Sequence, residues 1–222
     1  MSKTVQTVVG IPGLWTGRTD IVTSIASKSG GYLFAGSVLL DTATNDGFGL
    51  EIYDHDPDLV HAFSIAGSRT FNKDLLEEIK NHTQTLYVIG DGGSMESLQK
   101  IAKAVNGLLR SGGLAVKIES TGIAHTYDHW IEKTQEFNVP NAYSLFVTLI
   151  GGEGTYYSCG MHNFGYRDAI VSGNISPNEA AYLLQTFLLH TLIENPTLNT
   201  GETFSTDADS PHYIISKEGC SM

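Results

Sequence analysis

Short apolar runs typical of β-strands alternate with helix-type apolar spacing along the whole sequence, and this alternation limits the possible folds more than any other feature. In the N-terminal part the order is strand, helix, strand, strand, helix, strand. Between the second and third strands, Asn45-Asp46-Gly47 is a strong signal for a hairpin turn. The strands are expected at residues 4–11, 31–40, 48–53 and 85–89, and the helices near 21–26 and 75–79.

The helix that begins after Ser94 has the most regular pattern in the chain, with apolar residues on one stripe and Gly112-Gly113 at its end. The stripe consists of Leu98, Ile101, Ala102, Val105, Leu108 and Leu109. A further long helix starts at Ser176-Pro-Asn-Glu179, which is a capping box, and is expected to be buried. The remaining strands are expected at 114–118, 142–150, 155–161, 168–172 and 212–216, and the helices near 127–137 and 176–195.

These patterns predict an α+β fold made of two ferredoxin-like halves of the βαββαβ type, at residues 1–93 and 94–222. The second half includes the bridging helix that begins after Ser94. An antiparallel or mixed sheet with the helices packed on one face is expected. The halves form either two sheets or one continuous domain, and the pattern leaves both arrangements open.

The charge of the chain restricts the class of partner. Lys and Arg number 13 and Asp and Glu number 24, which gives a formal net charge of −11. Such a chain repels nucleic-acid phosphates and anionic lipid, and it attracts a basic protein or a cation. We therefore expect a protein partner, and neither a nucleic acid nor a membrane.

Cysteine usage and hydropathy favour a cytoplasmic protein. The start, MSKTVQTVVG, lacks the apolar stretch of a secretion signal. The apolar segment 180–193 is interrupted by polar residues and is too short to cross a bilayer. Cys159 and Cys220 are too few for a disulfide framework, which fits a reducing compartment.

The stretch STGIAHTYDHW, residues 120–130, contains the first candidate site. In a helix, His125 and His129 would lie one turn apart on one face, with Asp128 beside them as a third metal ligand. The competing interpretation makes Thr126 the N-cap of a helix and Asp128 a first-turn anion that the helix dipole favours. His125 then lies outside the helix, and this second interpretation is preferred because it also accounts for Trp130 as an inward-facing residue.

Cys159-Gly-Met-His162 contains the second candidate, a thiolate–imidazole pair in which the histidine lowers the thiol pKa and the cysteine attacks. Together with His125 it defines an alternative function, a metal-assisted or Cys/His hydrolase centred on His125 and the loop 159–165. Alternation along a strand opposes the pairing, because positions 159 and 162 face opposite sides unless the chain turns at Gly160. An inert, buried cysteine is preferred.

The run DHDPD places Asp54, Asp56 and Asp58 at alternate positions, as in the first half of an EF-hand loop. The rest of the EF-hand pattern fails, because its sixth position is Leu59 and its twelfth is Ile65. A solvated acidic loop or a surface for a basic partner remains. With an exposed Trp15 after the first strand, these aspartates are the candidate partner-binding residues.

Four segments follow one another in a distinctive order: GGLAVKIESTGIAHTYDHW, AYSLFVTLI, YYSCGMHNFGYRDAIVS and SPNEAAYLL. Together they resemble the bacterial family called domain of unknown function 4261. In that family a Gly-rich lead into a strand is followed by Gly, His and Trp, and later by a Gly–aromatic–Gly segment. The resemblance is strongest over residues 85–195, and Asp128 and His129 are not part of it. The matching positions are Gly112, Gly113, Gly122, His125, Trp130, Gly160, Phe164 and Gly165.

The resemblance implies no reaction and no cofactor, since the family has no established activity. Relatives of this kind are similar in size and acidity to cytoplasmic proteins encoded beside polymorphic toxins. The function expected from the sequence is therefore a non-enzymatic protein-binding role, that of an immunity protein that neutralises a basic bacterial toxin.

Overall fold

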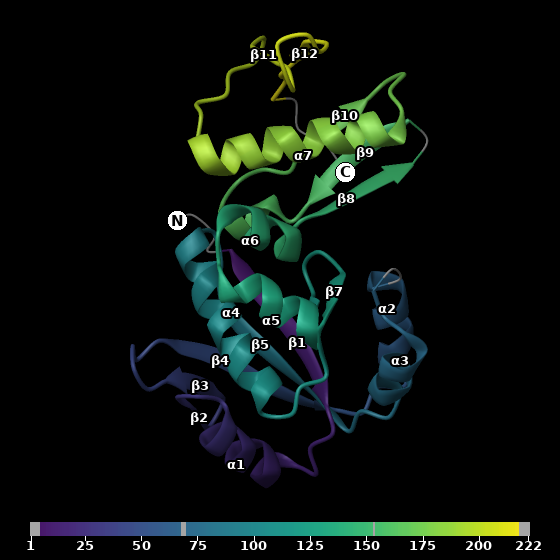
Figure 1. The fold of residues 1–222 in the computed structure, drawn as a ribbon. Helices are drawn as coiled ribbons and strands as arrows, with labels where there is room; N and C mark the ends of the chain where they lie inside the picture. Colours follow the sequence, from purple (N-terminus) through teal and green to yellow (C-terminus); the bar gives the residue numbers. More distant parts are fainter. Residues whose placement is uncertain (1–4, 68–69, 153, 218–222) are drawn as a thin grey trace. The chain divides into compact units, whose positions relative to one another are not determined.

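The computed structural model describes residues 5–67, 70–152 and 154–217, and its contacts divide the chain into two compact units. The first unit contains residues 1–148 and 160–166, and the second contains 149–159 and 167–222. Cys220 lies outside the described residues. Each unit has a sheet of its own, as Figure 1 shows.

The first unit is built on a seven-stranded antiparallel sheet with the strand order β2-β3-β4-β5-β1-β6-β7. Strand β1 lies beside β5 over its whole length and pairs on its other side with β6. The strands are β1 (Gln6–Gly13), β2 (Tyr32–Ala35), β3 (Val38–Asp41), β4 (Gly47–Asp54), β5 (Gln84–Asp91), β6 (Ala115–Ile118) and β7 (Ile123–Thr126).

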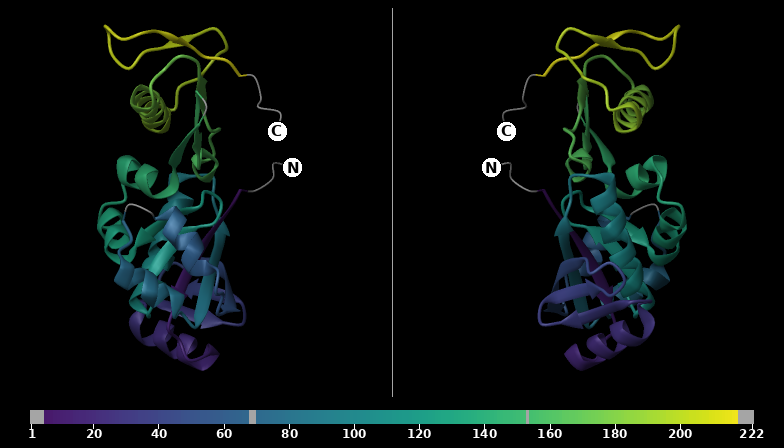
Figure 2. Two further views of the ribbon diagram at one scale, coloured as in Figure 1. Left: turned by 90° about the vertical axis from the view of Figure 1, so that its right-hand side faces the viewer. Right: turned by 90° about the vertical axis from the view of Figure 1, so that its left-hand side faces the viewer.

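Helices of the first unit pack on both faces of this sheet. The helices are α1 (Arg18–Lys28), α2 (Leu59–Ala66), α3 (Lys73–Lys80), α4 (Met95–Arg110), α5 (Tyr127–Gln135) and α6 (Val139–Phe146), with the short 3-10 helix η1 (Met161–Phe164). Helix α4 crosses β5 and β1, and α5 and α6 contact both α4 and β7. In Figure 2 these three helices lie on one side of the strands. We call the sheet face beneath them the inner face.

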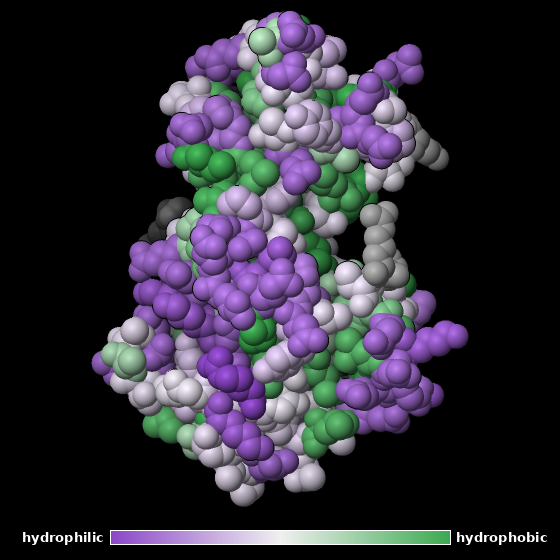
Figure 3. Space-filling view, viewed as in Figure 1, coloured by the Kyte–Doolittle hydropathy of each residue, from purple (hydrophilic) through white to green (hydrophobic). Residues whose placement is uncertain are grey.

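The inner face carries the main core, because strand alternation directs apolar side chains toward α4. Val9, Leu86, Val88 and Leu50 are all buried on this face, and Ile101 of α4 packs above Gly90. The fully buried Leu, Ile and Val side chains of α4 each contribute roughly 1.5–3 kcal/mol to folding. The outward surface of α4 and α5, which faces the viewer in Figure 3, is mostly hydrophilic. This layer therefore has an apolar inside and a solvated outside.

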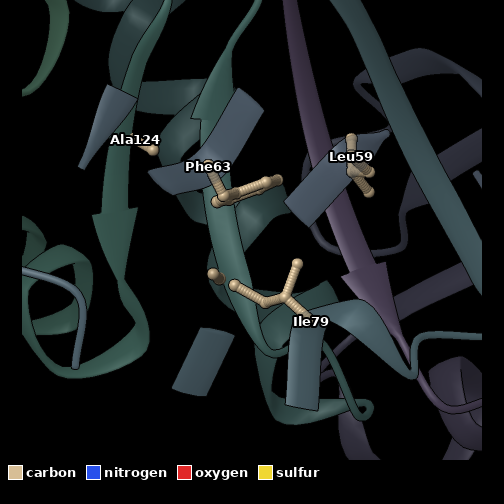
Figure 4. Close-up of a cluster of buried hydrophobic side chains, with 5 residues drawn as sticks. Leu59, Phe63, Ile79 and Ala124 are labelled. Carbon is tan, nitrogen blue, oxygen red and sulfur yellow. The ribbon is translucent and has the colours of Figure 1, made fainter. Parts of the chain in front are cut away.

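The opposite face, which we call the open face, is covered at only one end. There α2 and α3 bury a small cluster against β6 and β7 (Figure 4). The cluster consists of Leu59, Phe63, Ile79, Ala115 and Ala124. Farther along the face, Leu33, Val38 and Tyr53 remain 47, 45 and 54% exposed. No described element of the first unit covers the sheet at these positions.

The second unit packs one long helix on a three-stranded sheet. Its elements are β8 (Thr148–Gly152), β9 (Thr155–Cys159), β10 (Ile170–Ser172), α7 (Pro177–Glu194), β11 (Thr203–Phe204) and β12 (Tyr213–Ile214). Helix α7 contacts β9 and β10, and Phe187 and His190 pack on Phe204 of the β11–β12 hairpin. The predicted capping box is present, since Ser176 accepts from the Glu179 amide and Glu179 reaches back.

The predicted α+β class is confirmed, with antiparallel sheets and seven α-helices in the described chain. The predicted boundary between residues 93 and 94 falls between β5 and α4. Strands on both sides of this boundary belong to one sheet, because β6 pairs with β1 and β7 pairs with β6. Strands from both predicted halves therefore share this sheet. The helices are also not confined to one face, since α2 and α3 pack opposite α4.

Several local predictions are confirmed and others are wrong. Ser94 and Thr126 cap α4 and α5 as expected. The expected strand at 31–40 is two strands, because Gly36 takes a φ of 61° and reverses the chain. The expected strand at 142–150 begins as helix α6, whose first turn holds a proline and is capped by the Asn138 side chain. Helix α7 is less buried than predicted, since Tyr182 and Ile193 are both 58% exposed.

In the described part of the chain, no helix combines the length and the apolar composition that crossing a membrane requires.

Candidate functional site

His125, the first predicted site residue, lies in β7 beneath α5 and α6 and is 5% exposed. Its Nε2 is 2.8 Å from the carbonyl oxygen of Leu145. Because a carbonyl can only accept, Nε2 carries the proton and donates it. Burial lowers the pKa of His125 to about 4, with a smaller contribution from His129, so the ring is neutral at pH 7. His125 is therefore a neutral core residue.

The predicted metal site of His125, Asp128 and His129 is not assembled. The two imidazole rings are stacked, with centroids 5.2 Å apart and planes 21° apart. Metal coordination uses the lone pair in the ring plane, and nearly parallel stacked rings direct these lone pairs along separate planes. Among the described residues, no group of three or more His, Cys, Asp or Glu side chains is placed to hold a metal ion.

The preferred interpretation of this stretch, a capped start of a helix, is confirmed at Thr126. Its side chain accepts a hydrogen bond from the amide of His129 at 3.2 Å, and Asp128 lies in the first turn. Trp130 faces inward with no exposed surface, as predicted. One expectation was incomplete, because residues 123–126 are a strand and not only a connection.

The second predicted pair, Cys159 and His162, is divided between the two units. The chain turns at Gly160, where φ is 130°, so Cys159 ends β9 and His162 lies in η1. Burial and the nearby Asp168 raise the pKa of the Cys159 thiol. A raised pKa keeps the sulfur protonated, which is the opposite of what a nucleophilic cysteine needs. The preferred prediction was an inert, buried cysteine; the direction of the pKa fits an inert thiol, but Cys159 is only half-buried.

Trp15, predicted as an exposed partner-binding residue, is buried and 3% exposed, so that expectation of exposure is wrong. Its indole nitrogen donates to the carbonyl oxygen of Ser111 at 2.8 Å. The ring lies against Gly13 and Gly112, where an added Cβ would meet it. Trp15 therefore joins the end of β1 to the end of α4.

The acidic loop between β4 and α2 is ordered by His82, a buried histidine 2% exposed. His82 Nδ1 donates to the carbonyl oxygen of Ile79 at 2.7 Å, and Nε2 accepts from the amide of Asp56 at 3.2 Å. Burial lowers the pKa of His82 and keeps the ring neutral, as this pattern requires. The Asp56 side chain then accepts the amide of Asp58 at 2.9 Å. The loop thus presents its carboxylates in a fixed arrangement.

His55 completes this corner. Its Nδ1 donates to the carbonyl oxygen of His82 at 2.7 Å, and the two rings lie with centroids 4.6 Å apart. Beside them is an open hollow of about 590 Å³. The hollow is lined by His55, Pro57, Val60, Lys80, Asn81, His82 and Thr83. Its two imidazoles already bond to backbone groups, so it offers a recess in the surface and no evident catalytic group.

One row of side chains crosses the open face beside this loop. Strand pairing places Glu51 directly opposite Tyr87, Tyr87 opposite Gly10, and Gly10 opposite Lys117. Tyr53 lies two residues along β4 from Glu51 and so on the same face. From strand to strand the row therefore contains an acid, an aromatic ring, a glycine without a side chain, and a base.

The two tyrosines of the row form a pair, which together with Glu51 we call the tyrosine patch. Their ring centroids are 5.2 Å apart and their planes meet at 83°, an edge-to-face contact. The Tyr53 hydroxyl donates to Glu51 Oε2 at 3.0 Å. The pKa of Tyr87 is raised to about 12, mainly by burial and to a smaller extent by Glu119, Asp56 and Tyr53, in that order. Both a sheet carboxylate and the acidic loop therefore act on this ring.

Gly10 makes room for the patch, because a Cβ there would lie 3.0 Å from the Tyr87 ring and 2.9 Å from Glu119 Oε1. Tyr87 thus rests against the bare backbone of β1. Lys117 forms an ion pair with Glu119 at the far side of this gap. Of the acids around the patch, Glu119 is thus already neutralised within the protein.

Residues 157–221 match the sequence model of a family described as Domain of unknown function (DUF4261). The family resemblance predicted from the sequence is confirmed over this stretch. The match covers less than half of the chain, and it includes Gly160, Phe164 and Gly165 of the expected pattern but not His125 or Trp130. No match was found among curated proteins, and none among solved structures. The family description assigns no activity.

The sequence did not single out His82, Tyr53, Tyr87 or Glu51. His82 is far along the chain from Asp56, and only the fold brings them together. A signal was available for part of the patch, since Glu51 and Tyr53 occupy the polar positions of an alternating strand, where an exposed aromatic is unusual. Their partner Tyr87 depends on the register of β4 against β5, which the sequence does not state.

Proposed function

We propose that the protein is a non-enzymatic cytoplasmic binding protein, an immunity protein that neutralises a basic bacterial toxin by docking the open face against it. One observation carries the proposal. The open face is uncovered over β2 to β5 and presents exposed apolar side chains, two tyrosines and carboxylates side by side. Such a mixture of aromatic and acidic groups suits a basic protein surface.

The charge of the chain supports the same partner. A net charge of −11 raises the rate of encounter with a cationic protein and disfavours acidic ones. Asp54, Asp56 and Asp58 stand at the end of β4, next to Tyr53, and are exposed. Acids on the rim of the face steer the approach, while the tyrosines supply contact area at low entropic cost.

The histidines and cysteines favour binding over chemistry. His125 donates its Nε2 proton to a backbone carbonyl, His82 uses both ring nitrogens, and burial keeps the Cys159 thiol protonated. The one remaining lone pair, on His125 Nδ1, belongs to a ring that is 5% exposed and stacked on His129, and Cys159 lacks the lowered thiol pKa of a nucleophile. The hydrolase alternative therefore gains no support from their geometry.

The test begins with the product of the neighbouring reading frame, co-expressed with the full chain and purified as a complex. Affinity is then measured by calorimetry for the native protein and for the triple variant Asp54→Lys, Asp56→Lys, Asp58→Lys. We expect the triple reversal to weaken binding by about a hundredfold, because attraction at three rim positions becomes repulsion.

The matched control is Glu96→Lys, Glu132→Lys, Glu136→Lys, which changes the net charge equally on α4, on α5 and at the C-cap of α5. It should lower the affinity only slightly, because these positions change the overall charge and lie outside the proposed docking surface. Equal losses for the two triple variants would assign the effect to overall charge and overturn the docking surface. A partner that is acidic, or none at all, would overturn the immunity role.

A further inference from the structure

We infer that the tyrosine patch is a recognition site for an arginine side chain of the partner protein. The inference rests on the proposed function and adds to it the chemical group of the partner that the open face recognises. Tyr53 is 54% exposed and lies edge-to-face with Tyr87, so about half of its surface is open to a planar cation. Glu51 stands at the edge of the pair, held by the Tyr53 hydroxyl.

The arrangement has the two components that guanidinium recognition uses. A guanidinium stacks on a tyrosine face and at the same time donates in its own plane to a carboxylate. Here the ring and the acid belong to alternate positions of one strand, Tyr53 and Glu51, with Tyr87 directly across from Glu51. A lysine ammonium is a point charge that does not stack, so the geometry favours arginine.

The charges around the patch also favour a cationic ligand. Burial is the main cause that raises the pKa of Tyr87, and the carboxylates of Glu119 and of Asp56 in the acidic loop add to it, in that order. Lys117, the basic member of this row, is engaged with Glu119. Among the described residues Glu51 forms no ion pair, so the Tyr53 and Glu51 side of the patch keeps its negative charge.

The patch is held rigidly, which lowers the cost of binding. Tyr87 lies over Gly10 in the middle of the sheet, and β4 and β5 are paired from Gly49 to Asp54. Both rings thus stand on paired strands and not on a loop. Preorganised aromatic anchors lose little side-chain entropy when a partner binds.

The test uses the ¹⁵N-labelled full chain and three blocked peptides, acetyl-Gly-X-Gly-X-Gly-amide, in which X is arginine, lysine or citrulline. Amide chemical shifts are followed during titration at low salt. We expect saturable shifts at residues 50–54 and 86–88 with the arginine peptide, binding about threefold weaker with lysine, and none with citrulline. Citrulline keeps the shape of arginine without its charge.

Two variants localise the effect. Tyr53→Leu removes the ring and keeps an apolar side chain, and Glu51→Gln removes the charge and keeps the shape. Each should weaken the arginine peptide by about threefold or more. Tyr157→Leu is the matched control, since Tyr157 is another exposed tyrosine on a strand, in the second unit, and it should change nothing.

Shifts that citrulline reproduces, or that Tyr53→Leu leaves unchanged, would overturn the arginine site. If the peptide fails while the co-expressed toxin still binds and loses affinity in the aspartate triple variant, the inference is wrong and the proposed function stands. If the arginine peptide binds the patch and no basic toxin binds the protein, the arginine site stands and the immunity role is wrong.

Discussion

The first unit contains two histidine pairs that look alike and serve different ends. In each pair one ring is buried, His125 in one and His82 in the other, and donates to a backbone carbonyl at 2.8 or 2.7 Å. Burial is the main cause that lowers the pKa in both. Each buried ring also packs against a second histidine, with centroids 5.2 and 4.6 Å apart.

The two pairs differ in the use of the second ring nitrogen of the buried histidine and in the part of the protein that each pair stabilises. His125 lies under α5 and α6, with Trp130 beside it, and anchors Leu145 within the core. His82 uses its second nitrogen to accept the amide of Asp56 and so fixes a surface loop of acids. The pair with spacing typical of metal ligands is thus internal, whereas the pair separated along the chain shapes the surface proposed to bind a partner.

The largest effect that separates the pairs is a loss of stability in acid through His125. The pKa of His125 is about 4 in the folded chain and 6.5 in the unfolded chain. Between these pH values the unfolded chain binds a proton that the folded chain does not bind. The free energy of unfolding therefore falls as the pH is lowered from 6.5 to 4, by about 3 kcal/mol from this residue. Urea unfolding at several pH values measures it.

His125→Gln should flatten this dependence, since the amide can still donate to Leu145 and does not titrate. His61→Gln, at an exposed position on α2, is the control and should leave the slope unchanged. A wild-type stability that is flat over this range would contradict the assignment.

A smaller effect is expected at the second pair from His82→Ala. The change removes the bonds to Ile79 and Asp56 and should cost about 2 kcal/mol of unfolding free energy. Unlike His125→Gln, it should also lower the hydrogen-exchange protection of the Asp56 amide at pH 7. Loss of stability with full protection of Asp56 would mean that His82 does not hold the loop.

In the wild type, acid should break the hydrogen bond from the Asp56 amide to His82 Nε2, because protonation of Nε2 removes its lone pair. The folded pKa of His82 is lowered, so the bond is intact above pH 6.5 and is lost as the pH falls through the folded pKa. The protection factor of Asp56 should fall with it. His55→Ala, which keeps His82, provides the comparison.

Smaller still are the effects of removing the outer ring of each pair. His129 and His55 are more exposed than their partners, and a ring pair contributes roughly 0.5–1.5 kcal/mol. We expect His129→Ala and His55→Ala each to cost about 1 kcal/mol or less in thermal or urea unfolding. A loss near that of His82→Ala for either variant would mean that the outer ring carries the structure.

The sequence predicted elements that repeat a local rule and missed those that depend on distant neighbours. Helix α4 was found because its apolar stripe has one period, and Ser94, Thr126 and Ser176 were found because capping needs only a few adjacent residues. Helix α6 was mistaken for a strand because a short, mostly apolar run is too short to show a helical period, even though Ser144 is exposed within it. Asn138 followed by Pro140 was the signal that could have corrected it.

The site was less predictable than the fold. Asp54, Asp56 and Asp58 were singled out from their spacing, but His82, which orders them, lies beyond α2 and α3. Trp15 was expected at the surface because it follows a strand in a glycine-rich segment, and the glycines instead make room for its burial. The tyrosine patch exists only once the register of β4 with β5 is known, which depends on pairing across the whole sheet.

The smallest expected effect is that of Zn²⁺. It should leave the melting temperature unchanged in the native chain and in the histidine variants of both pairs. A metal bound only by the folded protein raises stability as its concentration exceeds the dissociation constant. His125 could offer only Nδ1, from a ring stacked on His129, and His82 has both nitrogens in hydrogen bonds. A melting temperature that rises with Zn²⁺ and loses this rise in His129→Ala would show that the β7–α5 pair rearranges to bind metal, and the contrast between the two pairs would then reverse.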